Sequence, residues 1–182
     1  MTSNSSNKIG HVAIIMDGNS RWARQRSLKT IEGHKHGVNR LRDIVRYSAK
    51  SEITHLSVFA FSTENWKRSA SDVSDLMKLF LQSIIKEVPE LIENKVQLNF
   101  IGDIPRFSKS LVSQINSAMK DTQAKKPNLN LNVAISYGGR WDILNAIKRL
   151  KDQQINIDKI NEDDFSNLLS TSNFPDPDLL IR

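Results

Sequence analysis

Short apolar runs alternate along this chain with longer helical patterns, and this alternation constrains the fold more than any other feature. Strands that alternate with helices form parallel sheets, because the chain must cross back over the sheet between neighbouring strands. We therefore predict an α/β fold with an open, mainly parallel sheet and helices on both faces. The predicted strands are residues 12–16, 55–61, 96–101, 129–136 and 178–181.

The stretches between these runs show helical spacing. The helix that opens at Gly33 has apolar residues on one face and basic residues on the other, which is typical of a helix at the protein surface. Most of those basic residues are therefore expected to be solvated. They are Arg40, Arg42, Arg46 and Lys50.

Two patterns modify this outline. Pro89 cannot donate a backbone hydrogen bond to Ile85, so we expect a bend or a break near the end of the longest helix. Asn residues alternate with apolar ones in residues 129–136, which favours a strand near an edge of the sheet. A loop is predicted at 27–32, and the other helices at 21–26, 71–94, 105–122, 140–151 and 162–170.

The first apolar run, residues 12–16, is too short for a helix and is typical of a strand buried on both faces. It ends at Asp17, followed by the turn residues Gly18 and Asn19 and by Ser20 as a helix N-cap. In α/β sheets, ligands bind beyond the carboxyl ends of strands, and a helix start there favours an anion. Asp17 would repel an anion unless a divalent cation bridged them, so it indicates Mg²⁺ with a diphosphate. The alternative is that Asp17 only forms the turn.

The second run, residues 55–61, also ends in polar residues, and two strands with polar ends indicate a binding crevice. Arg68 suits phosphate recognition, because its guanidinium can donate two parallel hydrogen bonds. Trp66 is of a type that more often packs in cores than contacts ligands. The whole polar cluster is Ser62, Thr63, Glu64, Asn65, Trp66, Lys67 and Arg68.

Composition places limits on the class of protein. The chain has 182 residues, of which 38% are hydrophobic, so we predict one domain over 9–182 after a disordered polar tail at 1–8. The absence of cysteine fits a reducing compartment, and we expect a cytoplasmic location. No apolar run reaches the length of a membrane-spanning helix, so contact with lipid would be peripheral. The net charge of +6 favours an anionic partner, which could be a diphosphate, a nucleic acid or a lipid headgroup.

Five motifs in order carry a resemblance to a known family: HVAIIMDGNSRWA from His11, GHKHG from Gly33, FAFSTENWKR from Phe59, IGD from Ile101 and SYGGRWDI from Ser136. The chain resembles the cis-prenyltransferases, whose bacterial type is undecaprenyl diphosphate synthase. The resemblance implies that isopentenyl diphosphate is condensed onto an allylic, farnesyl-type diphosphate with Mg²⁺. It also implies a homodimer, peripheral membrane contact for product release and no nucleic-acid partner.

The same resemblance assigns roles to residues. It implies that Asp17 holds Mg²⁺ and that Asn65 takes part in proton transfer. A hydrophobic tunnel for the growing isoprenoid would be lined by Ala60, Leu76 and Phe80, with the depth of the bacterial enzymes. The implied substrate-binding residues are Gly18, Asn19, Ser20, Arg21, Trp22, His34, Ser62, Thr63, Glu64, Trp66, Arg68 and Arg182.

The chain departs from the family pattern at three places. Thr30 stands where the family has Arg, although the neighbouring Lys29 could supply the charge, and Ser69 replaces a usual Pro. The family continues beyond Arg182 with a further Arg, a Ser and a metal-binding Glu. From this we expect a fragment whose fold lacks its last elements and which does not catalyse condensation by itself.

Two functional classes remain open on the sequence alone. The first is a chain-elongating enzyme, and the second is a non-catalytic prenyltransferase-like subunit or inactive fragment. Subunits of that kind typically lack the first-strand Asp, so Asp17, Asn65 and Arg68 favour descent from an enzyme. A nucleotide-binding Rossmann domain is a distant third, because neither of its usual glycine motifs occurs.

Overall fold

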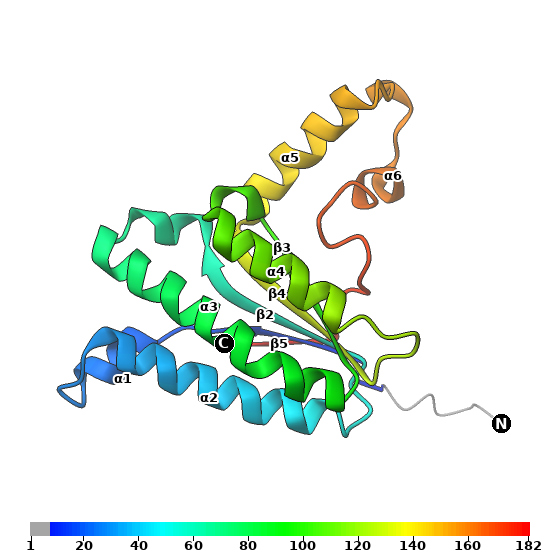
Figure 1. Cartoon of the computed structure of the whole chain (residues 1–182). Coiled ribbons are helices and arrows are strands. Elements are labelled where there is room, and N and C mark those ends of the chain that lie inside the picture. The colour runs from blue at the N-terminus through cyan, green and yellow to red at the C-terminus, as the bar shows by residue number, and fades with distance from the viewer. Residues whose placement is uncertain (1–7) are drawn as a thin grey trace.

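A computed structural model describes residues 8–182, and these residues form a five-stranded parallel sheet (Figure 1). The spatial order is β3-β4-β2-β1-β5, and every neighbouring pair is parallel, as the sequence predicts. The tail predicted at 1–8 lies outside the described residues except for Lys8, which pairs with Glu52. The strands are β1 (His11–Ile15), β2 (His55–Ser62), β3 (Val96–Ile101), β4 (Leu129–Tyr137) and β5 (Leu179–Ile181).

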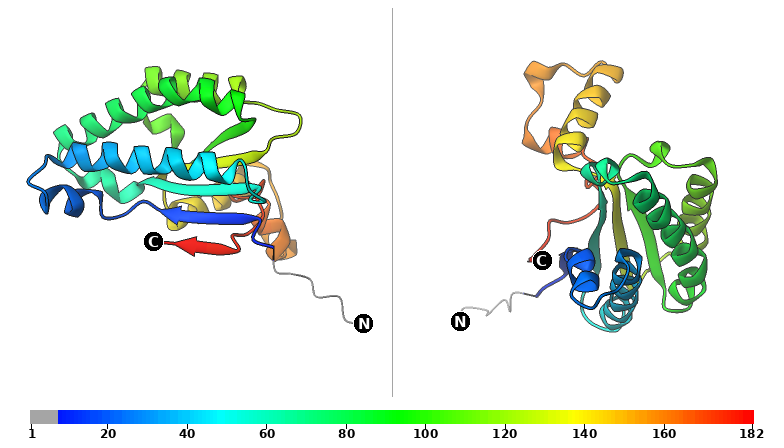
Figure 2. Two further views of the ribbon diagram at one scale, coloured as in Figure 1. Left: turned by 90° about the horizontal axis from the view of Figure 1, so that it is seen from below. Right: turned by 90° about the vertical axis from the view of Figure 1, so that its left-hand side faces the viewer.

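Helices lie on both sides of the sheet (Figure 2). Three of them, α2, α3 and α4, cover one face, whereas α5 and α6 lie on the other side (Figures 1 and 2). The α-helices are α1 (Asn19–Arg24), α2 (Thr30–Ser48), α3 (Ala70–Glu93), α4 (Lys109–Asp121), α5 (Gly139–Asp152) and α6 (Glu162–Ser166). Short 3₁₀ turns are η1 (Thr63–Lys67), η2 (Ile104–Arg106) and η3 (Ile157–Lys159).

The main core lies between the sheet and α2–α4. Val12, Leu56, Leu131 and Leu98 come from four adjacent strands and are partners in register, so they form one apolar row across the sheet. All four are buried, and they belong to one cluster with residues of α2 and α3. Full burial of one such side chain contributes about 1.5–3 kcal/mol, so this row stabilises the packing of α2 and α3 on the sheet.

A polar row crosses the opposite face. Asn132 of β4 donates to Ser57 Oγ at 3.2 Å and accepts from Asn99 Nδ2 at 3.1 Å, and Ser57 Oγ lies 2.7 Å from His11 Nε2. The prediction placed β4 near an edge, and β4 lies next to the edge strand β3 but is not itself an edge strand, since it pairs with β3 and β2 on its two sides. Its Asn side chains are compatible with an interior strand because they satisfy one another across the strands.

Several predicted helix limits are wrong for physical reasons. The first helix begins at Asn19 with Gly18 as its N-cap, because Gly18 takes the positive φ of 88° that the turn needs, so Ser20 does not cap it. The long helix α3 continues through Pro89 without a break. The first apolar run is also less buried than predicted: of residues 12–16, only Val12 is buried.

Two other helices are shorter than predicted. The helix expected at 105–122 divides into η2 and α4, and Ser108 caps α4 by accepting from Leu111 N at 3.3 Å. The helix expected at 162–170 ends at Ser166. Beyond it, the Ser170 N–H donates to the buried Asp142 carboxylate at 3.0 Å, a bond that holds the chain out of helical geometry.

Candidate active site

The candidate site lies at the carboxyl ends of the strands, where β1, β2 and β5 stop beside one another (Figure 1). Asp17 follows β1, Ser62 ends β2 and Arg182 follows β5. The sheet therefore brings together residues that are up to 165 positions apart in the sequence. This is the edge of an α/β sheet at which ligands usually bind.

Asp17 is the carboxylate at the centre of a small charged cluster. Its Oδ2 accepts from Arg182 Nη2 at 2.9 Å and from Arg21 Nη2 at 3.3 Å, and its Oδ1 accepts from the Gly18 N–H at 2.6 Å. The hydrogen bond from Arg182, followed by that from Gly18, lowers the pKa of Asp17 below its ordinary value. The carboxylate is therefore ionised at neutral pH and is partly exposed at the end of β1.

The first helix rests directly on α2, and two glycines permit this. A Cβ atom at Gly33 would lie 2.1 Å from Asn19 O, and one at Gly37 would lie 2.7 Å from Asn19 Oδ1. Gly33 is thus inside α2, which begins at Thr30, and the prediction that Gly33 opens the helix is wrong. Sequence reasoning missed this role, although two glycines four residues apart on one helix face are a signal of close packing.

A cavity of about 180 Å³ extends from this edge between α2, α3 and the sheet. Its polar lining consists mainly of Asn19, His34, Asn65 and Arg68, together with charged residues farther along the two helices. The predicted tunnel residues Ala60, Leu76 and Phe80 all line its apolar part. The cavity therefore combines a polar end beside Asp17 with a largely apolar interior.

His34 has the most unusual environment of these residues. Its Nε2 atom is buried and is the only buried side-chain polar atom without a hydrogen-bond partner within residues 8–182. Burial lowers the pKa of His34, and the charge of Arg68 lowers it further, while Asp72 opposes the shift. A neutral imidazole with an unpaired nitrogen lining a cavity is suited to hydrogen-bond a ligand.

The η1 turn fixes the loop after β2. Asn65 Oδ1 accepts from the Ser62 N–H at 2.9 Å, and the Ser62 side chain accepts from the Asn65 N–H, so the two residues form a capping box. This leaves the Asn65 Nδ2 group available to the cavity that Asn65 lines. Thr63 contacts Gly138, where an added Cβ would lie 2.7 Å from Thr63 Oγ1, so this glycine has a structural use.

The two tryptophans that the resemblance assigns to substrate binding both pack against neighbouring side chains. Trp66 donates from Nε1 to Ser136 Oγ at 2.9 Å and packs on Phe61 and Phe107 in the second core cluster. Trp22 on α1 lies against the His36 ring of α2 at a centroid distance of 4.5 Å. Neither residue lines the cavity, so the contacts within residues 8–182 support a packing role for both.

A second, more open cavity adjoins the first at the starts of α2 and α3. It is lined by Lys29 and Thr30 together with His34 and Arg68, and also by Asp72, Asp75, Ile31 and Leu76. Lys29 thus lies in the same cavity as the two residues expected to meet a diphosphate. Its ammonium can supply charge there but not the bidentate contact of an Arg.

The remaining predicted residues are dispersed. Gly18 and Arg21 belong to the Asp17 cluster, and Ser20 is partly buried on α1. Glu64 is exposed on η1. None of these four lines the main cavity.

Asp17 is the carboxylate at this edge of the sheet that could contact a metal ion. Within residues 8–182, no group of three or more His, Cys, Asp or Glu side chains could hold a metal ion. A single exposed carboxylate still fits Mg²⁺, which is commonly bound by one or two carboxylates and by substrate phosphates. Among the same residues, no helix has both the length and the apolar character needed to cross a bilayer.

Comparisons with known proteins agree on one family. The family model described as "Putative undecaprenyl diphosphate synthase" matches residues 15–182. A ditrans,polycis-undecaprenyl-diphosphate synthase of Haemophilus influenzae, named as specific for (2E,6E)-farnesyl diphosphate, is 43% identical over 176 residues, which cover 94% of this chain and 73% of that protein. An isoprenyl transferase of Neisseria meningitidis is 44% identical over 172 residues, covering 94% of this chain and 68% of that protein.

A solved structure is similar in fold. The crystal structure of lavandulyl diphosphate synthase from Lavandula x intermedia, in complex with dimethylallyl diphosphate, superposes with a TM-score of 0.89 at 35% identity. The superposition covers 96% of this chain and 77% of that one. The same sheet and helices therefore occur in a protein that binds an allylic diphosphate.

Proposed function

The chain belongs to the undecaprenyl diphosphate synthase family of prenyltransferases, and on that premise we propose that it elongates a farnesyl-type allylic diphosphate with isopentenyl diphosphate. In each cycle the allylic carbon–diphosphate bond breaks and a carbon–carbon bond forms to the isopentenyl double bond. A proton then leaves, which gives a new cis double bond, and the freed diphosphate departs. The product is a long polyprenyl diphosphate of the undecaprenyl type, a lipid carrier for cell-wall glycan synthesis.

The observation that carries this proposal is the shape of the main cavity. A diphosphate needs a polar, cationic end, and a polyprenyl chain needs an apolar interior; both occur in one continuous lining. Arg68 and His34 lie at the polar end, with Asp17, Arg21 and Arg182 beside it. Ala60, Leu76 and Phe80 line the interior. We assign proton transfer to the region of Asn65, whose Nδ2 group faces no partner among the described residues.

We propose Asp17 as the protein's ligand for Mg²⁺, with phosphate oxygens completing the coordination. When bound, the ion would neutralise charge on the leaving diphosphate. The chain's own residues orient the substrate: Arg182 and Arg21 already direct their guanidinium groups at the Asp17 carboxylate. The same groups can donate to the diphosphate that shares the ion.

The direct test is a product assay on the protein expressed from its complete gene. With farnesyl diphosphate, isopentenyl diphosphate and Mg²⁺, we expect a polyprenyl series whose formation stops when EDTA is added. Replacing Asp17 by Ala should lower turnover by about 10²–10³-fold, because charge stabilisation at the leaving group is lost. Arg24→Ala on the following helix α1, an exposed residue outside both cavities, is the matched control. Near-normal turnover by Asp17→Ala would contradict the assignment.

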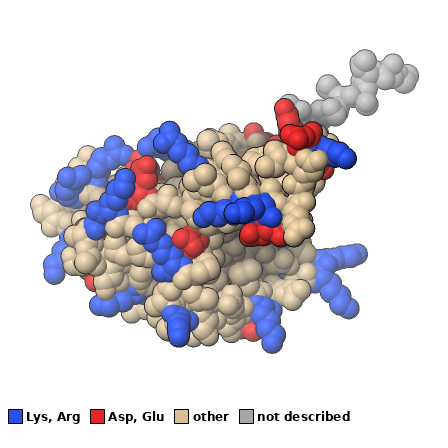
Figure 3. Space-filling view, turned by 90° about the horizontal axis from the view of Figure 1, so that it is seen from above, with Lys and Arg blue, Asp and Glu red and all other residues tan. Residues whose placement is uncertain are grey.

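The family also suggests how the product leaves. We propose a homodimer that acts in the cytoplasm and touches the membrane peripherally when the lipid is released. The net charge of +6 supports contact with acidic headgroups, and Figure 3 shows basic side chains spread around one face with fewer acidic ones. Sedimentation with vesicles that contain acidic lipids, compared with neutral vesicles, tests this contact.

A non-catalytic subunit is the second candidate. Such a subunit would need the fold but not the charged cluster or the unpaired imidazole. The hydrogen bonds at Asp17 and the buried Nε2 of His34 are specific features that a purely structural chain would not need to keep. They favour the enzyme.

A further inference from the structure

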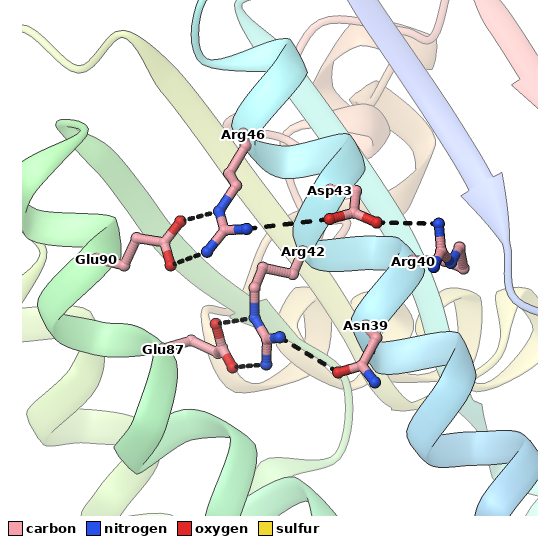
Figure 4. A network of polar contacts seen from close by, with 7 residues as sticks. All are labelled: Asn39, Arg40, Arg42, Asp43, Arg46, Glu87 and Glu90. Carbon is pink, nitrogen blue, oxygen red and sulfur yellow. Dashed lines mark hydrogen bonds and ion pairs between the residues drawn. The ribbon is translucent and has the colours of Figure 1, made fainter.

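Two Arg–Glu pairs join α2 to α3 (Figure 4). Arg42 donates to Glu87 with Nε, at 2.7 Å, and with Nη2, so the contact is bidentate. Arg46 donates to Glu90 in the same manner, with Nη2 at 2.7 Å and with Nε. Asn39 Oδ1 also accepts from Arg42 Nη1, at 3.2 Å. We call these two pairs the helix clasp.

The helix clasp lies along the wall of the main cavity. Arg42, Glu87 and Glu90 all belong to its lining, and they interrupt a surface that is otherwise mostly apolar. Both helices begin beside the polar end of the cavity and run away from it in the same direction (Figure 1). Arg42 is eight residues beyond His34 on α2, a distance of about 12 Å along the helix axis. The clasp is therefore far from the reacting end and faces the tail of any bound chain.

The inner pair is the stronger constraint. The Arg42 and Glu87 side chains are each only 20% exposed, whereas Arg46 is 49% exposed. The hydrogen bonds that Arg42 donates to Glu87 raise the pKa of Arg42, so the guanidinium stays charged. Breaking one partner away from a half-buried pair leaves an unpaired charge beside an apolar cavity, which is unfavourable. The two helices are thus held at a fixed separation.

The size of the cavity makes this separation important. A cavity of about 180 Å³ is smaller than the 300–1,000 Å³ that typically enclose a ligand of drug size. A polyprenyl chain of many isoprene units is larger than such a ligand. Its growth therefore requires either that α2 and α3 separate or that the chain tail leaves between them, and the clasp closes that gap.

We propose that the Arg42–Glu87 pair, supported by Arg46–Glu90, is a determinant of product length that holds α2 and α3 together and limits how far the growing chain extends. This inference rests on the proposed elongation function and deepens it. Product length is limited at the space between α2 and α3, because the apolar tail of the growing chain meets charged side chains that close this space. An unclasped wall would let the tail pass between the helices, so longer products would form.

The test compares product masses from five proteins. Arg42→Met and Glu87→Met each remove the clasp's inner pair and should shift the main product upward by at least about one isoprene unit. Arg42→Glu combined with Glu87→Arg restores an ion pair with the two charges exchanged between the helices. This double variant should return the product distribution toward that of the wild type. Arg40→Met removes the exposed pair with Asp43 on α2 alone, so it is the matched control and should keep the wild-type distribution.

A covalent cross-link between α2 and α3 should have the opposite effect on product length. The chain has no cysteine, so Arg42→Cys with Glu87→Cys introduces the only two thiols, and a bifunctional thiol reagent can join them. The joined protein should make products no longer than the wild type, whereas the unjoined protein should make longer ones. Binding of a long-chain polyprenyl alcohol probe can be measured without turnover. The joined protein should bind this probe more weakly than the unjoined protein does.

The outcomes separate this inference from the proposed function. If the wild type elongates and the clasp variants share its product distribution, the clasp is structural only and the inference is overturned. If the charge-swapped pair folds but keeps the lengthened products of the single variants, the inference is also overturned. If the wild type makes no polyprenyl product, the proposed function fails first.

Discussion

The two faces of the sheet are built from different interactions. On the face toward α2 and α3, an apolar row is formed by Val12, Leu56, Leu131 and Leu98, and the last two of these line the cavity. On the other face, His11, Ser57, Asn132 and Asn99 make a row of hydrogen bonds. Apolar contacts have no directional requirement, whereas hydrogen bonds fix distances and angles. The comparison indicates that one face can adapt to a lipid while the other holds the strands, and thus the site at their ends, in register.

The polar face continues into the segment that carries β5. His11 Nδ1 donates to Pro175 O at 2.6 Å, and the Asp178 carboxylate accepts from the backbone N–H groups of Gly10 and His11. Asp142, which is 1% exposed, accepts from Ser170 and from Tyr137 Oη. These bonds place Arg182 beside Asp17. The polar face therefore positions a residue of the site, although its own side chains do not line the cavity.

The largest expected effect breaks the apolar row. Leu56→Ala removes a fully buried side chain and leaves a cavity, so it should lower the free energy of unfolding by about 2–5 kcal/mol. Urea unfolding followed by circular dichroism measures this change. Ile85→Ala on the exposed side of α3 is the control, with an expected change within about 0.5 kcal/mol. Equal effects of the two substitutions would show that the row is not the main core.

A smaller effect should follow on the polar face. Asn132→Leu leaves Asn99 and Ser57 without a shared partner in a buried position, which should cost about 1–3 kcal/mol. The same unfolding experiment applies, with the exposed Asn116→Leu on α4 as the control. An unchanged or increased stability of Asn132→Leu would mean that the hydrogen-bonded row does not fix the strands.

The smallest effect concerns alkaline pH. Burial, and then the charge of Asp142, raise the pKa of Tyr137 from about 10 to about 12. The folded state therefore retains the phenol proton longer than the unfolded state does. The resulting stabilisation is complete below pH 10 and is lost as the pH rises towards 12. Tyr137→Phe should lack this component when unfolding is measured across that range, and identical pH profiles would contradict it.

The strands could be predicted from the sequence because each is an apolar run bounded by turn residues. The lining residues Ala60, Leu76 and Phe80 were also predicted, through the family resemblance. The start of α2 was not, because the reason that Gly33 lies inside the helix is its contact with Asn19 on another helix. Such a contact between separate elements leaves only a weak local pattern in the sequence.

The helix clasp shows the same limit. The pattern of α2 predicts a solvated basic face, and Arg40 agrees with it, since its side chain is 78% exposed. Arg42 does not, because its partner Glu87 is 45 positions away on α3. The interior position of β4 was likewise unpredictable from its own residues, since the partners that satisfy Asn132 belong to β2 and β3.

The central claim is that the growing chain occupies the cavity between α2, α3 and the apolar face of the sheet. Ala60→Leu adds bulk to that lining without touching Asp17, His34 or Arg68, and product masses with farnesyl and isopentenyl diphosphates measure the result. The account predicts shorter products, by at least about one isoprene unit, from a protein that stays folded after an overpacking cost of about 1–3 kcal/mol. An unchanged product distribution from folded Ala60→Leu protein would show that the chain grows elsewhere.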